Sequence, residues 1–531
     1  MAQVSLPDSS PLPSVSEPRS GSPPEGVSDD VPAAPATIVV ERFEFDGNTA
    51  FSDRQLAAAA ERYTGRPLTF VELLEVETVV EEVYSQDGFI SSGAVIEANQ
   101  ALSPINAVVT VRVIEGELDA IEISGTRRLR NSYIRSRLEI ATTGALNQEN
   151  ILEALQLLQL DPLIKSVSAD LSAGARANSG VLSVAVEEAN PYRLEIFTNN
   201  GRVPTVGTIR RGITLGHRNL LGFGDELTGT YTNTNGSNSG DFSYSIPFNG
   251  QDGTFELAGG LTDTEVVEDP FDRIDLTGES FYWSAGFRQP VVRSPNREVA
   301  VGLALTGQSS QTKILGQGVR LSEGADLDGR VRITALRLSQ DWTERSVNDV
   351  LAARSQVSIG LDAFGATDNS NAPDSSFVVW QGQVQYVRKL PADILFSTRS
   401  NVQLADRPLL IQEQFNLGGL NSVRGYRQDS LLTDSGWFIS AETAFPIFRI
   451  SSVDGIFQLI PFIDYGVGWE VGSRDEPGAS DLLGVGIGAQ WQMSDTFSAR
   501  LDWGIPLIDR EDRDRTLQEQ GIYFSVKFSP F

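Results

Sequence analysis

Residues 456–470 read IFQLIPFIDYGVGWE, and the alternation in this stretch decides the fold. One set of alternate positions carries large apolar side chains: Phe457, Leu459, Pro461, Ile463, Tyr465, Val467 and Trp469. The other set is mainly small or polar: Gln458, Asp464, Gly466, Gly468 and Glu470. Because successive side chains of a strand point to opposite faces, this pattern predicts a β-strand with one apolar face. Residues 483–492 and 497–505 repeat the pattern.

These runs are long enough to cross a membrane as tilted strands, which takes about 9 to 11 residues, whereas strands of soluble proteins average about 5 to 6. Residues 192–531 hold about sixteen candidate strands, and closed bacterial membrane barrels have an even number. No run approaches the roughly 20 apolar residues of a spanning helix, so a helical membrane protein is excluded. Aromatic residues near segment ends are expected to form the girdles of the barrel: Tyr282, Trp283, Trp437, Trp469 and Trp503.

The composition argues against several other classes of protein. The formal net charge of -28 excludes a general nucleic-acid binder, which needs a basic surface for phosphates. The chain has no cysteine and one histidine, His217, which we interpret as structural. Histidine-based catalytic and metal constellations are therefore not supported, and no acidic pair stands out for a carboxylate hydrolase. We expect no enzymatic activity, no cofactor and no metal site.

Residues 1–37 are rich in proline and serine and poor in large apolar side chains, which predicts a disordered linker. A plug segment is the alternative. The beginning Met1-Ala2-Gln3 lacks the charged and apolar parts of a signal peptide, so we expect an already processed end.

Residues 38–116 predict a small α+β unit of the order β-α-α-β-β. Its helices are expected to begin at Ser52 and at Thr69, with Gln55 and Glu72 completing capping boxes. The same order repeats in residues 117–190, which predicts tandem domains. The acidic positions of the second helix are interpreted as a solvated face, with a bias on partner choice as the alternative: Glu72, Glu75, Glu77, Glu81 and Glu82.

Several motifs resemble one family. The segments FEFDGNTAF at 43–51, YSQDGF at 84–89 and VIEGELDAIEISG at 113–125 are similar to POTRA domains. The later segments resemble two-partner secretion transporters of the TpsB type, which export haemolysins and adhesins: NLLGFGDEL at 219–227, YSIPF at 244–248, LGGLNSVRGY at 417–426 and PFIDYG at 461–466. The resemblance covers about residues 38–531. NLLGFGDEL joins two predicted strands, so we interpret it as a hairpin turn rather than a phosphate-binding loop.

The resemblance implies two POTRA domains, at 38–116 and 117–190, followed by a transmembrane barrel at 191–531. It also implies that a long loop, residues 405–436, folds back into the lumen. The loop motif consists of Val423, Arg424, Gly425 and Tyr426. In the resembled family the arginine of this motif engages an acidic residue of the inner wall.

The strand alternation independently assigns Asp464 and Gly466 to the lumen face, because Ile463 and Tyr465 belong to the apolar face. We therefore predict a contact between Arg424 and Asp464. The last strand ends near Phe531, a terminal aromatic residue that resembles the signal for insertion of outer-membrane barrels.

The implied function is secretion of an unfolded partner protein, of the repeat-rich adhesin or haemolysin type, across the outer membrane. The POTRA domains would lie in the periplasm and pair with the partner by β-augmentation. Outer-membrane lipid and, during insertion, the barrel assembly machinery are the other expected partners, and we expect a monomer. The rivals are a barrel assembly factor, which shares this architecture, and a passive porin or adhesin.

Overall fold

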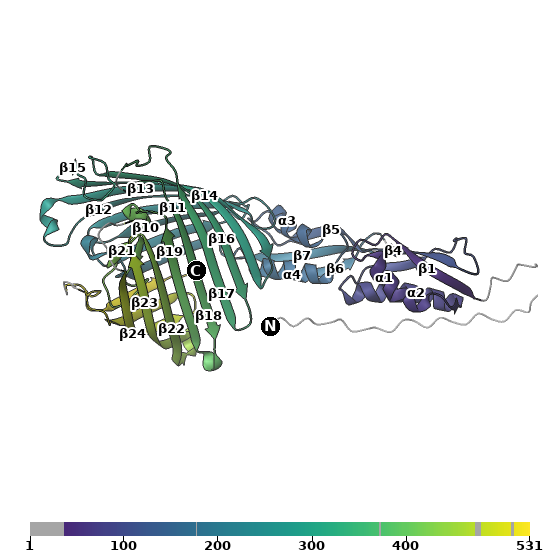
Figure 1. Cartoon of the computed structure of the whole chain (residues 1–531). Helices are drawn as coiled ribbons and strands as arrows, with labels where there is room; N and C mark the ends of the chain where they lie inside the picture. The colour runs from purple at the N-terminus through teal and green to yellow at the C-terminus, as the bar shows by residue number, and fades with distance from the viewer. Residues whose placement is uncertain (1–36, 177, 371–372, 473–478, 511–514) are drawn as a thin grey trace, which may run out of the picture.

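The computed structural model describes residues 37–531, apart from residue 177 and segments 371–372, 473–478 and 511–514. The predicted linker, except Thr37, lies outside the described residues. Two small α+β units form an arm that leaves one end of a large β-barrel (Figure 1). The arm marks one rim of the barrel, which we call the arm-side rim. The opposite rim is called the far rim.

The first unit contains one strand more than predicted. Its elements are β1 (Ile38–Asp46), α1 (Asp53–Ala60), η1 (Glu61–Tyr63), β2 (Pro67–Leu68), α2 (Phe70–Gln86), β3 (Gly93–Ile96) and β4 (Ala107–Ile114). The sheet order is β2-β1-β4-β3, with β1 and β4 parallel. The predicted order lacks β2, because a strand of two residues is too short to show a period of two in the sequence.

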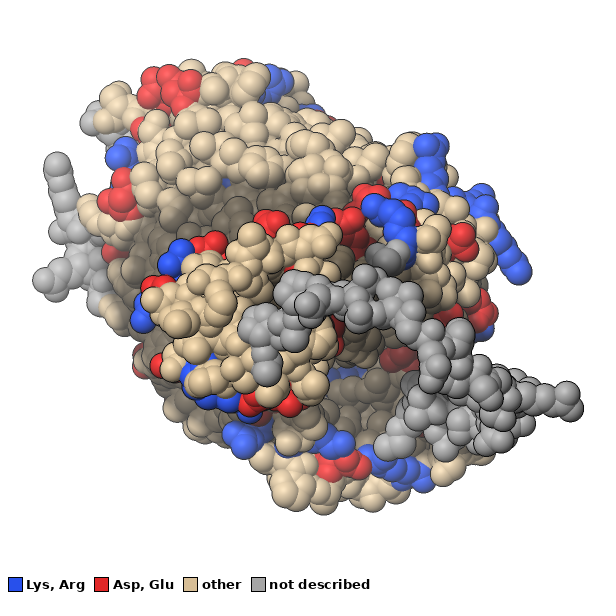
Figure 2. All heavy atoms as spheres, turned by 90° about the vertical axis from the view of Figure 1, so that its right-hand side faces the viewer, with Lys and Arg blue, Asp and Glu red and all other residues tan. Residues whose placement is uncertain are grey.

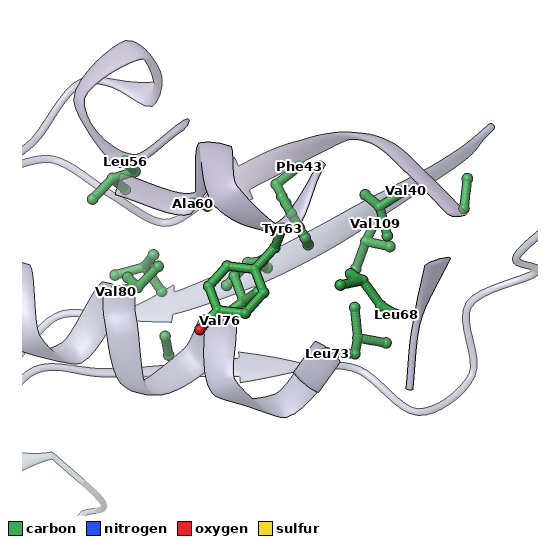
Figure 3. Close-up of a cluster of buried hydrophobic side chains, with 14 of the residues drawn as sticks. Val40, Phe43, Leu56, Ala60, Tyr63, Leu68, Leu73, Val76, Val80 and Val109 are labelled. Carbon is green, nitrogen blue, oxygen red and sulfur yellow. The ribbon is translucent and has the colours of Figure 1, made fainter. Parts of the chain in front are cut away.

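Both helices of this unit begin where the capping boxes predicted. The Ser52 backbone N–H donates to the Gln55 side chain at 3.0 Å, and the Thr69 backbone N–H donates to the Glu72 carboxylate at 2.8 Å. These bonds satisfy amide groups that have no partner inside a helix. In Figure 3, Val76 of α2 lies under the Tyr63 ring within a cluster of buried apolar side chains.

The second unit has the predicted order β-α-α-β-β. It contains β5 (Glu117–Ser124), α3 (Asn131–Ala141), α4 (Gln148–Gln159), β6 (Ile164–Ala173) and β7 (Ser179–Glu188), in the sheet order β5-β7-β6. Asn147 caps α4 by accepting from the backbone N–H groups of Glu149 and Asn150. Ile134, Leu138 and Leu158 pack the two helices onto the sheet.

The barrel closes through sixteen antiparallel strands of the described residues, the predicted number. They are β8 (Tyr192–Asn199), β9 (Arg210–Arg218), β10 (Glu226–Asn233), β11 (Ser237–Pro247), β12 (Thr254–Glu265), β13 (Leu276–Arg293), β14 (Arg297–Ile314), β16 (Arg330–Arg345), β17 (Asp349–Gly360), β18 (Val378–Lys389), β19 (Leu395–Ala405), β22 (Ser435–Ile450), β23 (Gly455–Trp469), β24 (Ser480–Met493), β25 (Phe497–Pro506) and β26 (Ile522–Phe528). The two-residue β15 (Gln317–Gly318) only extends β14, which pairs directly with β16. Strand β26 pairs with β8 to close the barrel.

The two faces of the strands follow the alternation in the sequence. Ile463 is 51% exposed on the outer face, whereas the adjacent Asp464 is fully buried inside. Trp437 and Trp503 lie on the outer face, as expected for a girdle. The prediction for Tyr282 was wrong, because it follows the period of two and points inward, where its hydroxyl donates to Asp241. In the described part of the chain, helices are either too short or too polar to span a membrane.

The second unit docks on the turns of the arm-side rim. The predicted hairpin turn, residues 219–225, joins β9 to β10, and its Phe223 ring lies 3.8 Å from the Arg130 guanidinium. His217 contacts Arg128 of the second unit, in agreement with a structural role. Asp252, in the next turn along this rim, forms ion pairs with Arg137 of α3 and with Arg293 of β13.

Candidate functional site

A long loop between β19 and β22 fills part of the barrel lumen. It contains η5 (Ile411–Glu413), β20 (Phe415–Leu417) and β21 (Leu431–Thr433), and the last two pair as a small hairpin. The loop motif is buried against the inner wall, because Val423 and Tyr426 are 0% exposed and Arg424 is 2% exposed. The loop begins at residue 406 and ends at 434, close to the predicted limits of 405 and 436.

Arg424 and Asp464 form the predicted contact. The Arg424 Nε donates to Asp464 Oδ2 at 2.7 Å and Nη2 donates to Oδ1 at 2.9 Å, a bidentate geometry. The Arg424 backbone N–H also donates to Oδ2, at 3.1 Å. Ser440 of β22 donates to the same carboxylate at 2.6 Å. Asp464 is therefore satisfied on both oxygens in a site without exposure to bulk water.

The wall of the lumen contributes more charged residues to the site than the sequence pattern predicted. Arg424 Nη1 lies 3.1 Å from Glu442 and 3.5 Å from Asp502, and Arg500 pairs with both of these carboxylates. The Arg424 guanidinium also lies 3.4 Å from the Phe462 ring centroid. The strand period places Arg500 and Asp502 on the lumen face, but the period does not show which lumen residues meet the loop.

The other motif residues fix the backbone of the loop. The Tyr426 hydroxyl lies 3.0 Å from the Leu483 carbonyl oxygen and 2.9 Å from that of Ile508. The Gly425 N–H donates to the Tyr523 hydroxyl at 2.9 Å. Gly425 has φ +109 and its Cα packs on β25, so a side chain here would be strained and would strike backbone.

Glycines of the wall allow the loop to approach closely. A Cβ at Gly466 would lie 3.0 Å from Val423 Cγ2, and one at Gly484 would strike the Arg424 carbonyl. Gly466 was predicted as a wall residue, and the structure places it directly under the loop motif. Gly484 was missed because an alternating strand offers no sign of which lumen glycine faces a loop.

A second contact anchors the loop at a different part of the wall. Arg337 of β16 donates to both carboxylate oxygens of Glu413, at 2.6 and 3.2 Å, and Glu413 is 8% exposed. Gln412, next to Glu413, donates to Ser310 of β14 at 2.6 Å. This anchor could not be predicted from the sequence, because Glu413 and Arg337 belong to no motif.

Between the loop and the wall lies a polar cavity of about 350 Å³. Arg399 and Arg500 line it from the wall, and Leu420 and Asn421 line it from the loop. The arrangement suits a plug held by ionic contacts: the low dielectric of the site strengthens each contact, while the nearby cavity provides room for the loop to shift. Phe531, predicted as an insertion signal, lies away from this site, 59% exposed beyond the end of β26.

The sequence matches known families along most of its length. A family model described as haemolysin secretion/activation protein ShlB/FhaC/HecB matches residues 178–491, and one described as POTRA domain, ShlB-type, matches residues 38–116. The chain is 23% identical over 425 residues to the heme/hemopexin transporter protein HuxB of Haemophilus influenzae, covering 78% of this chain and 73% of the relative. It is 23% identical over 487 residues to the outer membrane transporter CdiB of Escherichia coli strain 536, covering 89% and 79%.

Solved structures share the fold. CdiB from Escherichia coli superposes with a TM-score of 0.74 at 18% identity, over 95% of this chain and 92% of that chain. BamA from Haemophilus ducreyi lacking POTRA domains 1–3 gives a TM-score of 0.55 at 14% identity, over 93% of this chain and all of that chain. The first family model spans more than half of the sequence and covers the loop motif and its wall partner Asp464. The chain therefore belongs to the haemolysin secretion/activation family ShlB/FhaC/HecB, outer-membrane transporters that secrete partner proteins by two-partner secretion.

Proposed function

We propose that the POTRA domains recognise one unfolded partner protein in the periplasm and that the partner crosses the lumen after the loop motif releases from the wall. The observation that carries the proposal is the buried ion pair between Arg424 and Asp464, on a loop that fills the lumen. A pore blocked by such a loop needs the contact to open before a chain can pass. Folding of the partner outside the cell supplies the driving force.

The β3 edge of the first POTRA sheet is protected. The outward N–H groups of Ala94 and Ile96 in β3 donate to Glu81 and Glu77 of α2, at 3.4 and 2.5 Å. Side chains therefore occupy the positions that an added strand would use. Glu81 is exposed, as the interpretation of a solvated face predicted, and Glu77 is half-buried, but both also bond the edge strand because the helix packs beside it.

The β6 edge of the second POTRA sheet is open over most of its length. Among the described residues, strand β6 pairs with β7 alone. Gln159 of α4 bonds the Lys165 carbonyl and the Val167 N–H, so by alternation the free backbone groups on this side begin at Ala169. We propose that the partner adds a strand along residues 169–173. On the POTRA end of the molecule, acidic and basic side chains are interspersed, which suits recognition through backbone rather than charge (Figure 2).

A proline at Leu171 tests this edge. By alternation the Leu171 N–H points away from β7, so Leu171→Pro removes an outward donor and keeps the β6–β7 ladder. Loss of one hydrogen bond of about 1 kcal/mol, together with the misfit of the proline ring, weakens binding of the partner's amino-terminal region about tenfold. Leu171→Ala is the matched control, and it retains binding. Equal binding by both variants contradicts the proposed edge.

Crosslinking in cells separates secretion from barrel assembly. A photoreactive residue at Leu171 captures the protein in transit, which we expect to be a repeat-rich adhesin or haemolysin whose gene neighbours this one. Recovery of nascent outer-membrane barrels instead supports the rival function, barrel assembly. We further propose that the transporter works as a monomer and that Phe531 guides its insertion by the barrel assembly machinery. The relative HuxB is named a heme/hemopexin transporter protein, so a heme- or hemopexin-binding protein is a second candidate for the secreted partner.

A further inference from the structure

Two arginines lie on the lipid face of the barrel at the extracellular end of β16. The strand pairing shows on which face they lie. Arg330 and Arg332 occupy the same set of alternate positions of β16 as Leu338 and Trp342, which are 46% and 48% exposed on the outer face. Arg330 is the first residue of β16 at the rim farthest from the POTRA domains. Both arginine side chains are exposed. They therefore face the outer leaflet rather than the lumen.

Arg332 lies beside the aromatic girdle. Its Nη1 donates to the Gly365 carbonyl at 3.4 Å, and the neighbouring Phe364 ring packs edge-on against Trp283, with ring centroids 6.0 Å apart. Trp283 belongs to the outward row of β13 and was predicted as a girdle residue. Since such girdles mark the boundary between acyl chains and headgroups, the two arginines lie at headgroup depth.

A strained turn presents the aromatic part of this surface. Phe364 has φ +53, a left-handed conformation that is unfavourable for a bulky side chain, and its ring is 75% exposed. Backbone strain of this kind persists where surrounding contacts hold it and is concentrated at ligand sites. Here the turn places an apolar ring outside the barrel, next to a guanidinium.

The positive charge of the arginines is not neutralised within the described residues. Glu279, which lines the same surface depression of about 360 Å³, is already paired with Lys313. Asp263 also lines the depression, but it lies on β12, separated from β16 by β13 and β14. Among the described residues, neither Arg330 nor Arg332 has a carboxylate within ion-pair distance. Two guanidinium groups therefore keep donors available on a face that meets lipid.

We propose that Arg330 and Arg332 bind a phosphate on the headgroup of an outer-leaflet lipid, while Phe364 and Trp283 contact its acyl chains. Guanidinium forks match phosphate geometry and form charge-assisted hydrogen bonds with it. Without a bound anion, the positive charges of Arg330 and Arg332 would lie side by side at the membrane surface. The proposal is independent of partner secretion, because no residue of this site touches the lumen loop motif.

Lipid retention and thermal stability of the purified full-length protein test the proposal. Diphosphorylated lipid A in detergent raises the Tm of the wild type, because a ligand that binds the folded state stabilises it. The double variant Arg330→Gln with Arg332→Gln loses most of this shift and retains several-fold less phosphorylated lipid by mass spectrometry. Arg297→Gln is the matched control, since Arg297 lies on the same face near the periplasmic end and is paired with Glu344.

Two further additions identify the ligand. Dephosphorylated lipid A and inorganic phosphate each give the same small shift for wild type and double variant, if the site needs phosphate on a lipid. If inorganic phosphate raises the Tm of the wild type as much as diphosphorylated lipid A does, the result contradicts a lipid site. Wild-type lipid retention by the double variant, or an equal loss in Arg297→Gln, overturns the proposal. Heat-modifiable migration on gels verifies that each barrel is folded.

Discussion

At the scale of single residues, Arg424 is held by a contact that suits a switch. Its guanidinium lies among three carboxylates and against an aromatic ring. Coulombic attraction to these groups offsets the large cost of removing the guanidinium from water. A buried ion pair of this kind adds little net stability to the fold. Removing one of its two partners is nevertheless strongly destabilising, because the other charge stays buried without a counterion. The arrangement therefore defines one closed position of the loop rather than strengthening the barrel.

Arg424→Ala opens the pore in our account. Removing one partner of a buried pair costs about 3 to 5 kcal/mol, so the closed loop position loses at least about a hundredfold in relative population. Single-channel conductance in planar bilayers should show frequent large openings. Arg354→Gln is the control, because this lumen arginine pairs with Asp341 of the wall and has no contact with the loop in the described residues. Wild-type conductance of Arg424→Ala would falsify the role of the motif.

Glu413 supplies the second anchor, and its replacement has a smaller effect. Glu413→Gln keeps the shape of the side chain and weakens the ionic bond to Arg337 by about 1 to 3 kcal/mol. Openings should become more frequent than in the wild type but rarer than in Arg424→Ala. The variant that combines Glu413→Gln with Arg424→Ala tests whether the two anchors act separately. If its conductance equals that of Arg424→Ala alone, they do not, and the description of two anchors is wrong.

At the scale of elements, the two POTRA domains repeat one turn. A glycine with positive φ follows the first strand of each, Gly47 at +88 and Gly125 at +85. A Cβ on either would strike a strand carbonyl, so the turn needs glycine. A glutamate at the end of the last strand, Glu115 directly after β4 and Glu188 as the last residue of β7, then caps each turn. Glu115 accepts the Ala50 N–H at 2.8 Å, and Glu188 accepts the Leu129 N–H at 2.8 Å.

These two glutamates make POTRA stability depend on pH. Burial tends to raise the pKa of Glu115 and of Glu188, but the turn N–H groups outweigh it and hold each pKa below its usual value. A lowered folded pKa gives stability that is present above the unfolded pKa of about 4.3 and is lost as the pH falls through the folded pKa.

The Tm of the POTRA unfolding transition should therefore fall as the pH drops below about 4.3, and the fall should shrink in the variant Glu115→Gln with Glu188→Gln. Differential scanning calorimetry on the full chain measures it. Glu122→Gln, at an exposed position of β5, is the control. An unchanged pH profile in the double variant contradicts the assignment.

The elements that follow a clear sequence period could be predicted, and the contacts between distant segments could not. Alternation assigned Asp464 to the lumen, and capping boxes located the helix starts at Ser52 and Thr69. The two-residue β2 carries no period at all. Glu413 and Arg337 lie 76 residues apart and meet because the barrel curves around the loop. Neither the residue pattern nor the spacing therefore predicts their contact.

At the scale of the whole molecule, the docked second POTRA domain fixes the open edge of β6 relative to the pore. Asp252 ties α3 to the barrel wall through Arg137 and Arg293, and the turn at Phe223 packs under Arg130. A partner strand on residues 169–173 of β6 then lies on the periplasmic side of the barrel, at the end of the second domain that meets the first domain (Figure 1). Recognition and translocation are then successive steps along one axis, with the lumen loop as the barrier between them.

In the proposed mechanism, the lumen loop must leave the wall for the partner to pass. The native chain has no cysteine, and a Cβ at Gly466 would lie 3.0 Å from Val423 Cγ2, which suits a disulfide between the two positions. The most direct measurement is secretion of the partner by cells that carry Val423→Cys with Gly466→Cys, with and without reductant, beside each single variant. We expect secretion to be lost in the oxidised pair and restored on reduction. Undiminished secretion by the fully oxidised pair would contradict it.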